Sequence, residues 1–124
     1  MDFDQFHDAS IQSININGAL IEVHFKLLAG EKVVISFQDT KKFVCNYLTE
    51  SNVVLSINVI RNVKKSRSLL NKLYLIEDES RYDFIDKISS QITSGKMVLV
   101  EVAPSYGAEI IVLCKEFGAK PFNT

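Results

Sequence analysis

The sequence is poor in residues that interrupt regular structure, with two prolines and five glycines among 124 residues. Together with a hydrophobic content of 47% and a charged content of 23%, this scarcity excludes a disordered, collagen-like or low-complexity protein. Apolar runs are also short, and none approaches the roughly 18 residues that a membrane-spanning helix needs. We therefore expect one globular domain over residues 1–124, without a membrane partner.

Neither charge sign dominates, since 14 Lys and Arg face 15 Asp and Glu. This balance predicts no general attraction to nucleic acid or to an acidic membrane surface. The first ten residues carry three aspartates where a targeting peptide would carry Lys or Arg, so we expect an unprocessed, cytoplasmic protein. In that compartment Cys45 and Cys114 are predicted to be reduced thiols that pack as small hydrophobic side chains.

Motifs of the common enzyme classes are missing from the sequence. No C-x-x-C or H-x-x-x-H pair predicts a metal site, and the glycines form no nucleotide-binding loop or nucleophile elbow. We therefore predict no catalytic residue, no cofactor and no metal. His7 and Asp8 are neighbours, but adjacent side chains on a strand point to opposite faces, so one of them is expected to point inward and bind backbone groups. His24 is expected to be an exposed strand residue.

Short alternating runs rich in Ile and Val predict a mainly β protein. The clearest run extends from Ile14 to Leu27, where Asn17-Gly18 is typical of a type I′ turn that would pair Ile14 with Ile21. Further alternating runs occupy residues 33–37, 43–47 and 53–59. Five short strands joined by polar turns predict an antiparallel meander.

The pattern changes after residue 61. Residues 66–76 fit either a helix or a strand, and the helix is slightly favoured. Ser80 resembles a helix N-cap and Gly95 a helix end, and apolar residues between them recur every 3.6 residues. These signals predict a helix over about residues 81–93.

The last third of the chain returns to strands. Residues 97–102 and 108–115 are apolar on both parities, as in strands that are covered on both faces. The tail from residue 117 to residue 124 contains Gly118 and Pro121 and is expected to fray. The predicted fold class is α+β, mainly β, an antiparallel meander of about seven strands with one or two helices inserted before the last two strands.

Charge is unevenly distributed in the middle of the chain. Residues 61–72 contain five basic residues and no acid, and five acids follow between residues 77 and 86 with only Arg81 among them. One interpretation is a solvated loop and a helix whose acids favour its N-terminus. The other is a bipolar surface that steers a charged protein partner.

Several segments combine into a family pattern. Phe6-His7-Asp8-Ala9 is similar to an "FHDAE" start, residues 34–39 to an apolar-x-F-x-D-V strand, and residues 51–54 to Q-N-V-I. A weaker likeness covers residues 102–108 and the strand that ends at Cys114. Together they resemble small bacterial proteins of the immunity protein 50 type. Ser10 and Ser51 replace a Glu and a Gln of that pattern, its usual Trp-Pro is absent, and the middle segment looks like an insertion.

The resemblance implies a non-enzymatic antidote that binds and blocks a cognate bacterial toxin of the polymorphic or contact-delivered kind. Because many such toxins are basic nucleases, the acidic group is the preferred contact patch. Its members are Glu77, Asp78, Glu79, Asp83 and Asp86. The alternative is a small enzyme or ligand-binding domain with a pocket near His7, Asp8 and Tyr106. A homo-oligomer formed through an uncovered strand edge is a third possibility.

Overall fold

The computed structural model describes residues 3–75 and 82–122, and over these residues the protein has the predicted α+β, mainly β fold. A short helical turn precedes eight antiparallel strands in one sheet, together with two α-helices. The elements in chain order are η1 (Asp4–Phe6), β1 (Ser10–Asn17), β2 (Leu20–Lys26), β3 (Lys32–Gln38), β4 (Lys42–Asn46), β5 (Val53–Ile60), α1 (Val63–Leu73), α2 (Tyr82–Thr93), β6 (Val98–Tyr106), β7 (Glu109–Cys114) and β8 (Glu116–Pro121).

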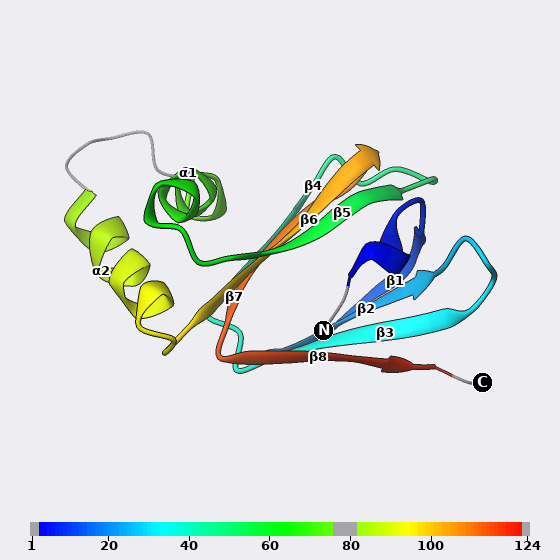
Figure 1. Ribbon diagram of the computed structural model, residues 1–124, viewed down its shortest axis with the longest axis horizontal. Helices are drawn as coiled ribbons and strands as arrows, with labels where there is room; N and C mark the ends of the chain where they lie inside the picture. Colours follow the sequence, from blue (N-terminus) through cyan, green and yellow to red (C-terminus); the bar gives the residue numbers. More distant parts are fainter. Residues whose placement is uncertain (1–2, 76–81, 123–124) are drawn as a thin grey trace.

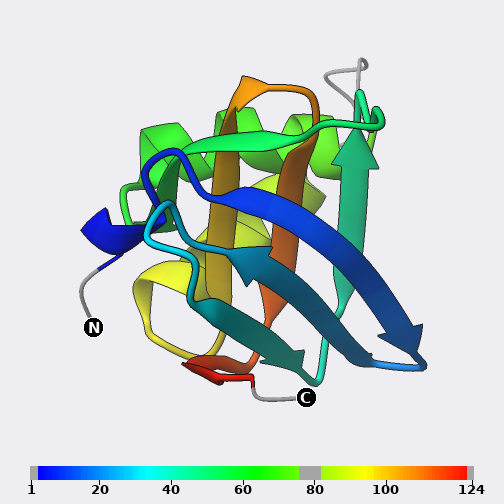
Figure 2. The same cartoon turned by 90° about the vertical axis from the view of Figure 1, so that its right-hand side faces the viewer.

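The sheet bends into two halves that face each other. Its strand order is β4-β7-β6-β5-β1-β2-β3-β8, and the two halves form the two arms seen in Figure 1. In Figure 2 strands β1, β2 and β3 run diagonally in front of the upright β6 and β7. Strands β1, β2 and β3 follow one another as the meander predicts, whereas β4 lies at the far edge beside β7.

Two connections hold the halves together. Only Lys115 separates β7 from β8, so nearly continuous extended chain passes from one half to the other. At the second connection β1 meets β5 over a short distance, with Ser10 opposite Val53. There the Val54 N–H donates to the Ala9 carbonyl at 2.8 Å, and the Asp8 N–H donates to the Val54 carbonyl at 2.9 Å.

The first hairpin forms, but its turn lies one residue later than predicted. Ile14 pairs with Val23 instead of Ile21, and Gly18 and Ala19 form the loop. Gly18 has a positive φ of 59° and Ala19 does not, which fits a type II′ turn and not the predicted type I′ turn. Because each partner changes by two residues, the same side chains keep the inner face.

Two hydrophobic cores result from this arrangement. The interior core lies between the sheet halves, and the helix-layer core lies between the two helices and the outer face of β5, β6 and β7. Strand β7 serves both cores, since Ile110 and Val112 face the interior while Ile111 and Leu113 face the helices. The prediction of a strand apolar on both parities is confirmed.

Both helices lie in the segment where the strand pattern stopped. Over residues 66–73 helix α1 resolves the ambiguity in favour of a helix, and the Asn62 side chain caps it by accepting from the Lys65 N–H. Residues 74 and 75 follow as a turn, and residue 76 lies outside the described residues. Helix α2 confirms the predicted helix from residue 82 to residue 93, whereas residue 81 and the predicted N-cap, Ser80, lie outside the described residues. Three strands follow the helices instead of the expected two.

The extra strand comes from the tail, and over residues 117–122 the expectation that it frays is wrong. Strand β8 pairs with β3 from Gln38 opposite Glu116 to Val33 opposite Pro121. Phe117 also stacks on Phe37, with ring centroids 6.2 Å apart. A full backbone ladder and an aromatic contact outweigh the local preferences of Gly118 and Pro121.

Candidate functional site

Helix α2 carries the described part of the predicted acidic patch. Asp83 lies exposed in its first turn, and Asp86 lies exposed one turn further on. The opposite side of the helix is anchored in the helix-layer core by Ile85 and Ile92, both at most 1% exposed. The remaining predicted members, Glu77, Asp78 and Glu79, lie outside the described residues.

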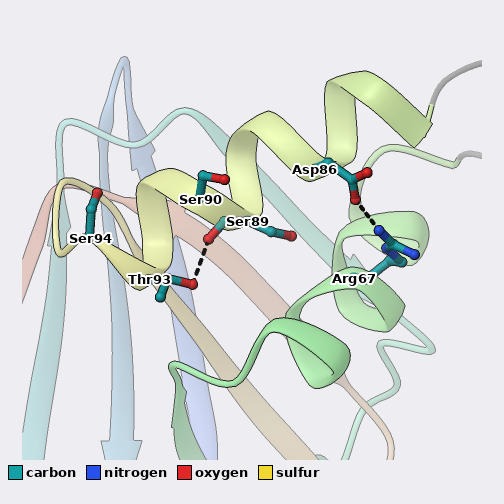
Figure 3. Close-up of a pocket in the computed structure, with 6 residues that line it drawn as sticks. All are labelled: Arg67, Asp86, Ser89, Ser90, Thr93 and Ser94. Carbon is teal, nitrogen blue, oxygen red and sulfur yellow. Dashed lines mark hydrogen bonds and ion pairs between the residues drawn. The ribbon is translucent and has the colours of Figure 1, made fainter.

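A hollow of about 480 Å³, bordered by polar and charged residues, lies between the two helices. Figure 3 shows its lining residues, which are Arg67, Asp86, Ser89, Ser90, Thr93 and Ser94. Arg67 reaches from α1 to form an ion pair with Asp86, and the Thr93 hydroxyl donates to the Ser89 carbonyl at 2.9 Å. Neither histidine nor cysteine lines this hollow, which offers hydroxyl groups and an ion pair for hydrogen bonding to a partner.

His7 and Asp8 are arranged differently from the expectation that one of them points inward. They form the turn between η1 and β1, where Asp8 has a positive φ of 65° that an aspartate tolerates. Their side chains are 62% and 46% exposed, and His7 Nδ1 lies 3.2 Å from Asp8 Oδ2. The inward-facing residues of this motif are Phe6 and Ala9, both fully buried.

A second hollow, of about 300 Å³, lies beside His7. Besides His7 it is lined by residues of η1 and β5, including Asp4, Leu55 and Asn58. Tyr106 does not line it, because Tyr106 pairs with Val53 on the β6 side of β5. The structure therefore brings His7 and Asp8 together and leaves Tyr106 on the other flank of β5.

Asn52 is a buried polar residue whose role the sequence reasoning missed. Its Oδ1 accepts the Thr49 N–H at 3.0 Å and the Ala108 N–H at 2.9 Å, and its Nδ2 donates to the Thr49 carbonyl at 2.7 Å. The Asn52 carbonyl also accepts the Ile11 N–H. One side chain thus joins the β4–β5 loop to the β6–β7 turn, and its position in the Q-N-V-I-like segment was the available signal.

Gly107 completes this connection between the β4–β5 loop and the β6–β7 turn, which we call the joint. It has a positive φ of 84°, and a Cβ there would lie 2.4 Å from Asn52 Oδ1 and 2.8 Å from the Ser51 carbonyl oxygen. Both the backbone conformation and the space therefore require glycine. The residues that carry the family resemblance hold the fold together at this point.

The thiols and His24 occupy structural positions. Burial, with a smaller effect of the nearby Glu116 carboxylate, raises the pKa of the Cys114 thiol to about 12. Burial also raises the pKa of the half-buried Cys45. His24 is less exposed than predicted, because its ring packs edge to face on the Phe122 ring, with the ring centroids 4.6 Å apart. Over residues 3–75 and 82–122, no three His, Cys, Asp or Glu side chains gather in a metal-binding arrangement.

No protein-family model, curated protein or solved structure matches this chain. Within the described part of the chain, neither helix combines the length and the apolar character that crossing a membrane requires.

Proposed function

We propose that this protein is a non-enzymatic immunity protein that binds and blocks a cognate bacterial toxin through its helix layer. The observation that carries the proposal is the presentation of Asp83 and Asp86 by a helix whose other side is held in a hydrophobic core. A rigid element with exposed charge loses little conformational freedom when a partner binds. It can also guide a partner of opposite charge to the correct orientation.

The charges of the neighbouring helix support a bipolar contact surface. Lys64 and Lys65 are exposed at the start of α1, and Arg67 lies beside Asp86 at the junction of the two helices. A basic toxin surface would be attracted to Asp83 and repelled from the start of α1. This arrangement favours one docking orientation over others.

The family resemblance supports the same function. Its recognisable residues include Phe6, Asn52 and Gly107, which are inward-facing or joint-forming in this structure. Segments that maintain a scaffold leave the helix layer free to differ between proteins that bind different toxins. Occlusion of the toxin's active site or of another essential surface would be the mechanism of protection.

The hollow beside His7 favours a second candidate function, the binding of a small ligand. Its volume of about 300 Å³ lies at the lower limit of typical ligand sites. Replacement of His7 by alanine would abolish ligand binding there and leave toxin neutralisation unchanged. Loss of neutralisation in that variant would instead place the toxin contact at this end of the sheet.

The neighbouring coding sequence provides the direct test. We expect it to encode a toxin-like C-terminal domain, and co-expression of this protein should restore the growth of cells that produce that domain. The purified pair should associate rapidly at low salt. Absence of both protection and binding would reject the proposal.

Charge reversal tests the contact surface. The double variant Asp83→Lys and Asp86→Lys should lower the association rate constant about ten-fold at low ionic strength, because steering depends on opposite charges. The matched control, Glu31→Lys with Glu116→Lys, changes the net charge equally on exposed residues outside the helix layer. Equal association rates for the two double variants would exclude the α2 surface while leaving toxin binding itself intact.

A further inference from the structure

The other side of α2 borders an apolar hollow of about 240 Å³, which we call the α2 pocket. Ile88 and Leu113 line it as nearly buried residues, 7% and 1% exposed. The rings of Tyr74 and Phe84 also line it and meet edge to face, with centroids 5.0 Å apart. Two residues of the helix-layer core thus form part of the lining of the α2 pocket, and two aromatic rings that contact each other form another part.

The remaining lining residues of the α2 pocket are polar, and none is acidic. They are Lys41, Lys87 and Gln91. Both lysine side chains are exposed, and the backbone N–H of Lys41 donates to the Leu113 carbonyl at 2.8 Å. A third lysine, Lys42, places its Nζ 5.8 Å from the centre of the Tyr74 ring.

The ammonium groups of Lys41 and Lys87 have no carboxylate partner among the described residues. The ion pairs found there belong to His7, Arg67 and Lys72. Asp83 precedes Lys87 by one helical turn, but no ion pair joins them in the described structure. An apolar hollow flanked by two unneutralised cations is complementary to an apolar group that carries negative charge beside it.

The size of the α2 pocket narrows the choice of occupant. Ligand sites for whole small molecules have volumes of about 300–1,000 Å³, and this hollow is smaller at about 240 Å³. A hollow below that range can still receive one side chain of a partner, as the pockets for anchor residues at the centre of protein interfaces do. The Gln91 amide at its rim can hydrogen-bond to the backbone of the segment that carries such an anchor.

We infer that the α2 pocket binds an acidic segment of a partner protein by taking up one aromatic or large aliphatic side chain, while carboxylates on either side of it meet Lys41 and Lys87. This inference goes beyond the proposed toxin neutralisation and is tested without a toxin. Helix α2 would then contact an acidic segment at the α2 pocket and a basic surface at Asp83.

A peptide titration followed by NMR tests the inference. The probe is an acetylated and amidated five-residue peptide with phenylalanine at its centre and two glutamates on each side. It should shift the amide signals of Tyr74, Phe84 and Lys87 in the full-length protein, and the shifts should weaken as salt rises. The same peptide with a central alanine, and a peptide with lysines around the phenylalanine, should produce no shift.

A pair of double variants tests the role of the lysines. Lys41→Gln with Lys87→Gln should lower the affinity for the acidic peptide about ten-fold, whereas the control, Lys32→Gln with Lys120→Gln on the other sheet half, should leave it unchanged. The melting temperatures of both variants should equal that of the wild type, so that a lower affinity reflects lost contacts with the peptide and not unfolding.

Four results would overturn the inference. They are no shift at millimolar peptide, equal binding of the acidic and basic peptides, tighter binding of 3-phenylpropionate than of the peptide, and concentration-dependent shifts of the same residues without peptide. The third result would assign the α2 pocket to a small carboxylic acid, and the fourth would assign it to a second copy of this chain.

Discussion

The two hydrophobic cores of this protein are built from different side chains. The interior core contains Phe6, Phe25 and Phe37, each at most 1% exposed, and Phe6 meets Phe25 edge to face at 5.1 Å. The helix-layer core is mainly aliphatic, and the buried Ser66 hydroxyl of α1 donates to the Ser89 hydroxyl of α2 at 3.3 Å. The family-like segments contribute to the interior core and its joint, whereas the charged proposed contact surface lies on the helix layer. The interior core and the charged helix surface therefore involve different residues.

Phe6→Ala should have the largest effect on stability. Phe6 is fully buried, so its removal leaves a cavity and should cost about 3–5 kcal/mol of unfolding free energy. Phe84→Ala in the helix layer is the matched variant, and it should cost only about 1–2 kcal/mol because Phe84 is 38% exposed. Urea unfolding measures both. Equal losses would show that the two cores contribute alike.

Gly107→Ala should have the next largest effect. Gly95 has nearly the same positive φ as Gly107, 85° against 84°, but a Cβ at Gly95 would meet nothing within 4 Å. Gly95→Ala should therefore cost about 1–2 kcal/mol for backbone strain alone. Gly107→Ala should cost about 1–3 kcal/mol more, because Asn52 would have to abandon buried hydrogen bonds. Similar costs for the two variants would mean that the joint tolerates displacement of Asn52.

A double-mutant cycle can attribute the excess to Asn52. In an Asn52→Ala background the side-chain oxygen nearest to the new Cβ is absent. The additional cost of Gly107→Ala over Gly95→Ala should then shrink, since the two residues interact directly. If the cost stays unchanged, the Ser51 carbonyl and not the Asn52 side chain sets the requirement for glycine.

The interior core should also weaken at high pH. Burial raises the pKa of Cys114 to about 12 in the folded protein, from 9.0 for a free thiol, so above pH 9 the unfolded state binds fewer protons than the folded state. Stability should therefore fall as pH rises from 9 towards 12, by at most about 1.4 kcal/mol per pH unit from this group. Cys114→Ala should show a shallower decline in urea unfolding across that range. If the unfolding free energies of wild type and variant fall in parallel with pH, the decline does not come from Cys114.

Asp86→Asn should have the smallest effect. The Arg67–Asp86 ion pair is about half exposed, with side chains 43% and 50% accessible. Its loss should change the unfolding free energy by no more than about 0.5 kcal/mol. Thermal unfolding at low and high salt measures this difference. A loss as large as that of Gly107→Ala would mean that the helix-layer surface is itself part of the stabilising core.

Local patterns were sufficient for several features of the fold. Alternation identified the inner faces of β2 and β3, because side chains on a strand alternate between its faces. In β1 it was less reliable, since Ile16 is 66% exposed. Helical spacing and Gly95 located α2, which ends at Thr93. Apolar residues on both parities of β7 correctly predicted burial on both faces. Each of these features depends on residues that are close together in the sequence.

The site was less accessible to sequence reasoning. Asp83 and Asp86 were predicted together and do share the outer part of α2, because helical spacing is regular. The pairing of His7 with Asp8 was not predicted, since it depends on a turn with positive φ in place of a strand. The α2 pocket escaped notice altogether, because Lys41 and Leu113 reach it from distant parts of the chain.

Composition and periodicity were enough to decide that this chain forms a mainly β domain with an amphipathic helix near residue 85, because burial of apolar side chains follows the repeat of each element. The neighbours of β4, β5 and β8 were decided only by contacts between distant parts of the chain. The position of β4 beside β7, the recruitment of the tail as β8 and the joint at Asn52 all depend on contacts between distant residues. A period of two specifies the face of a strand and not its neighbour.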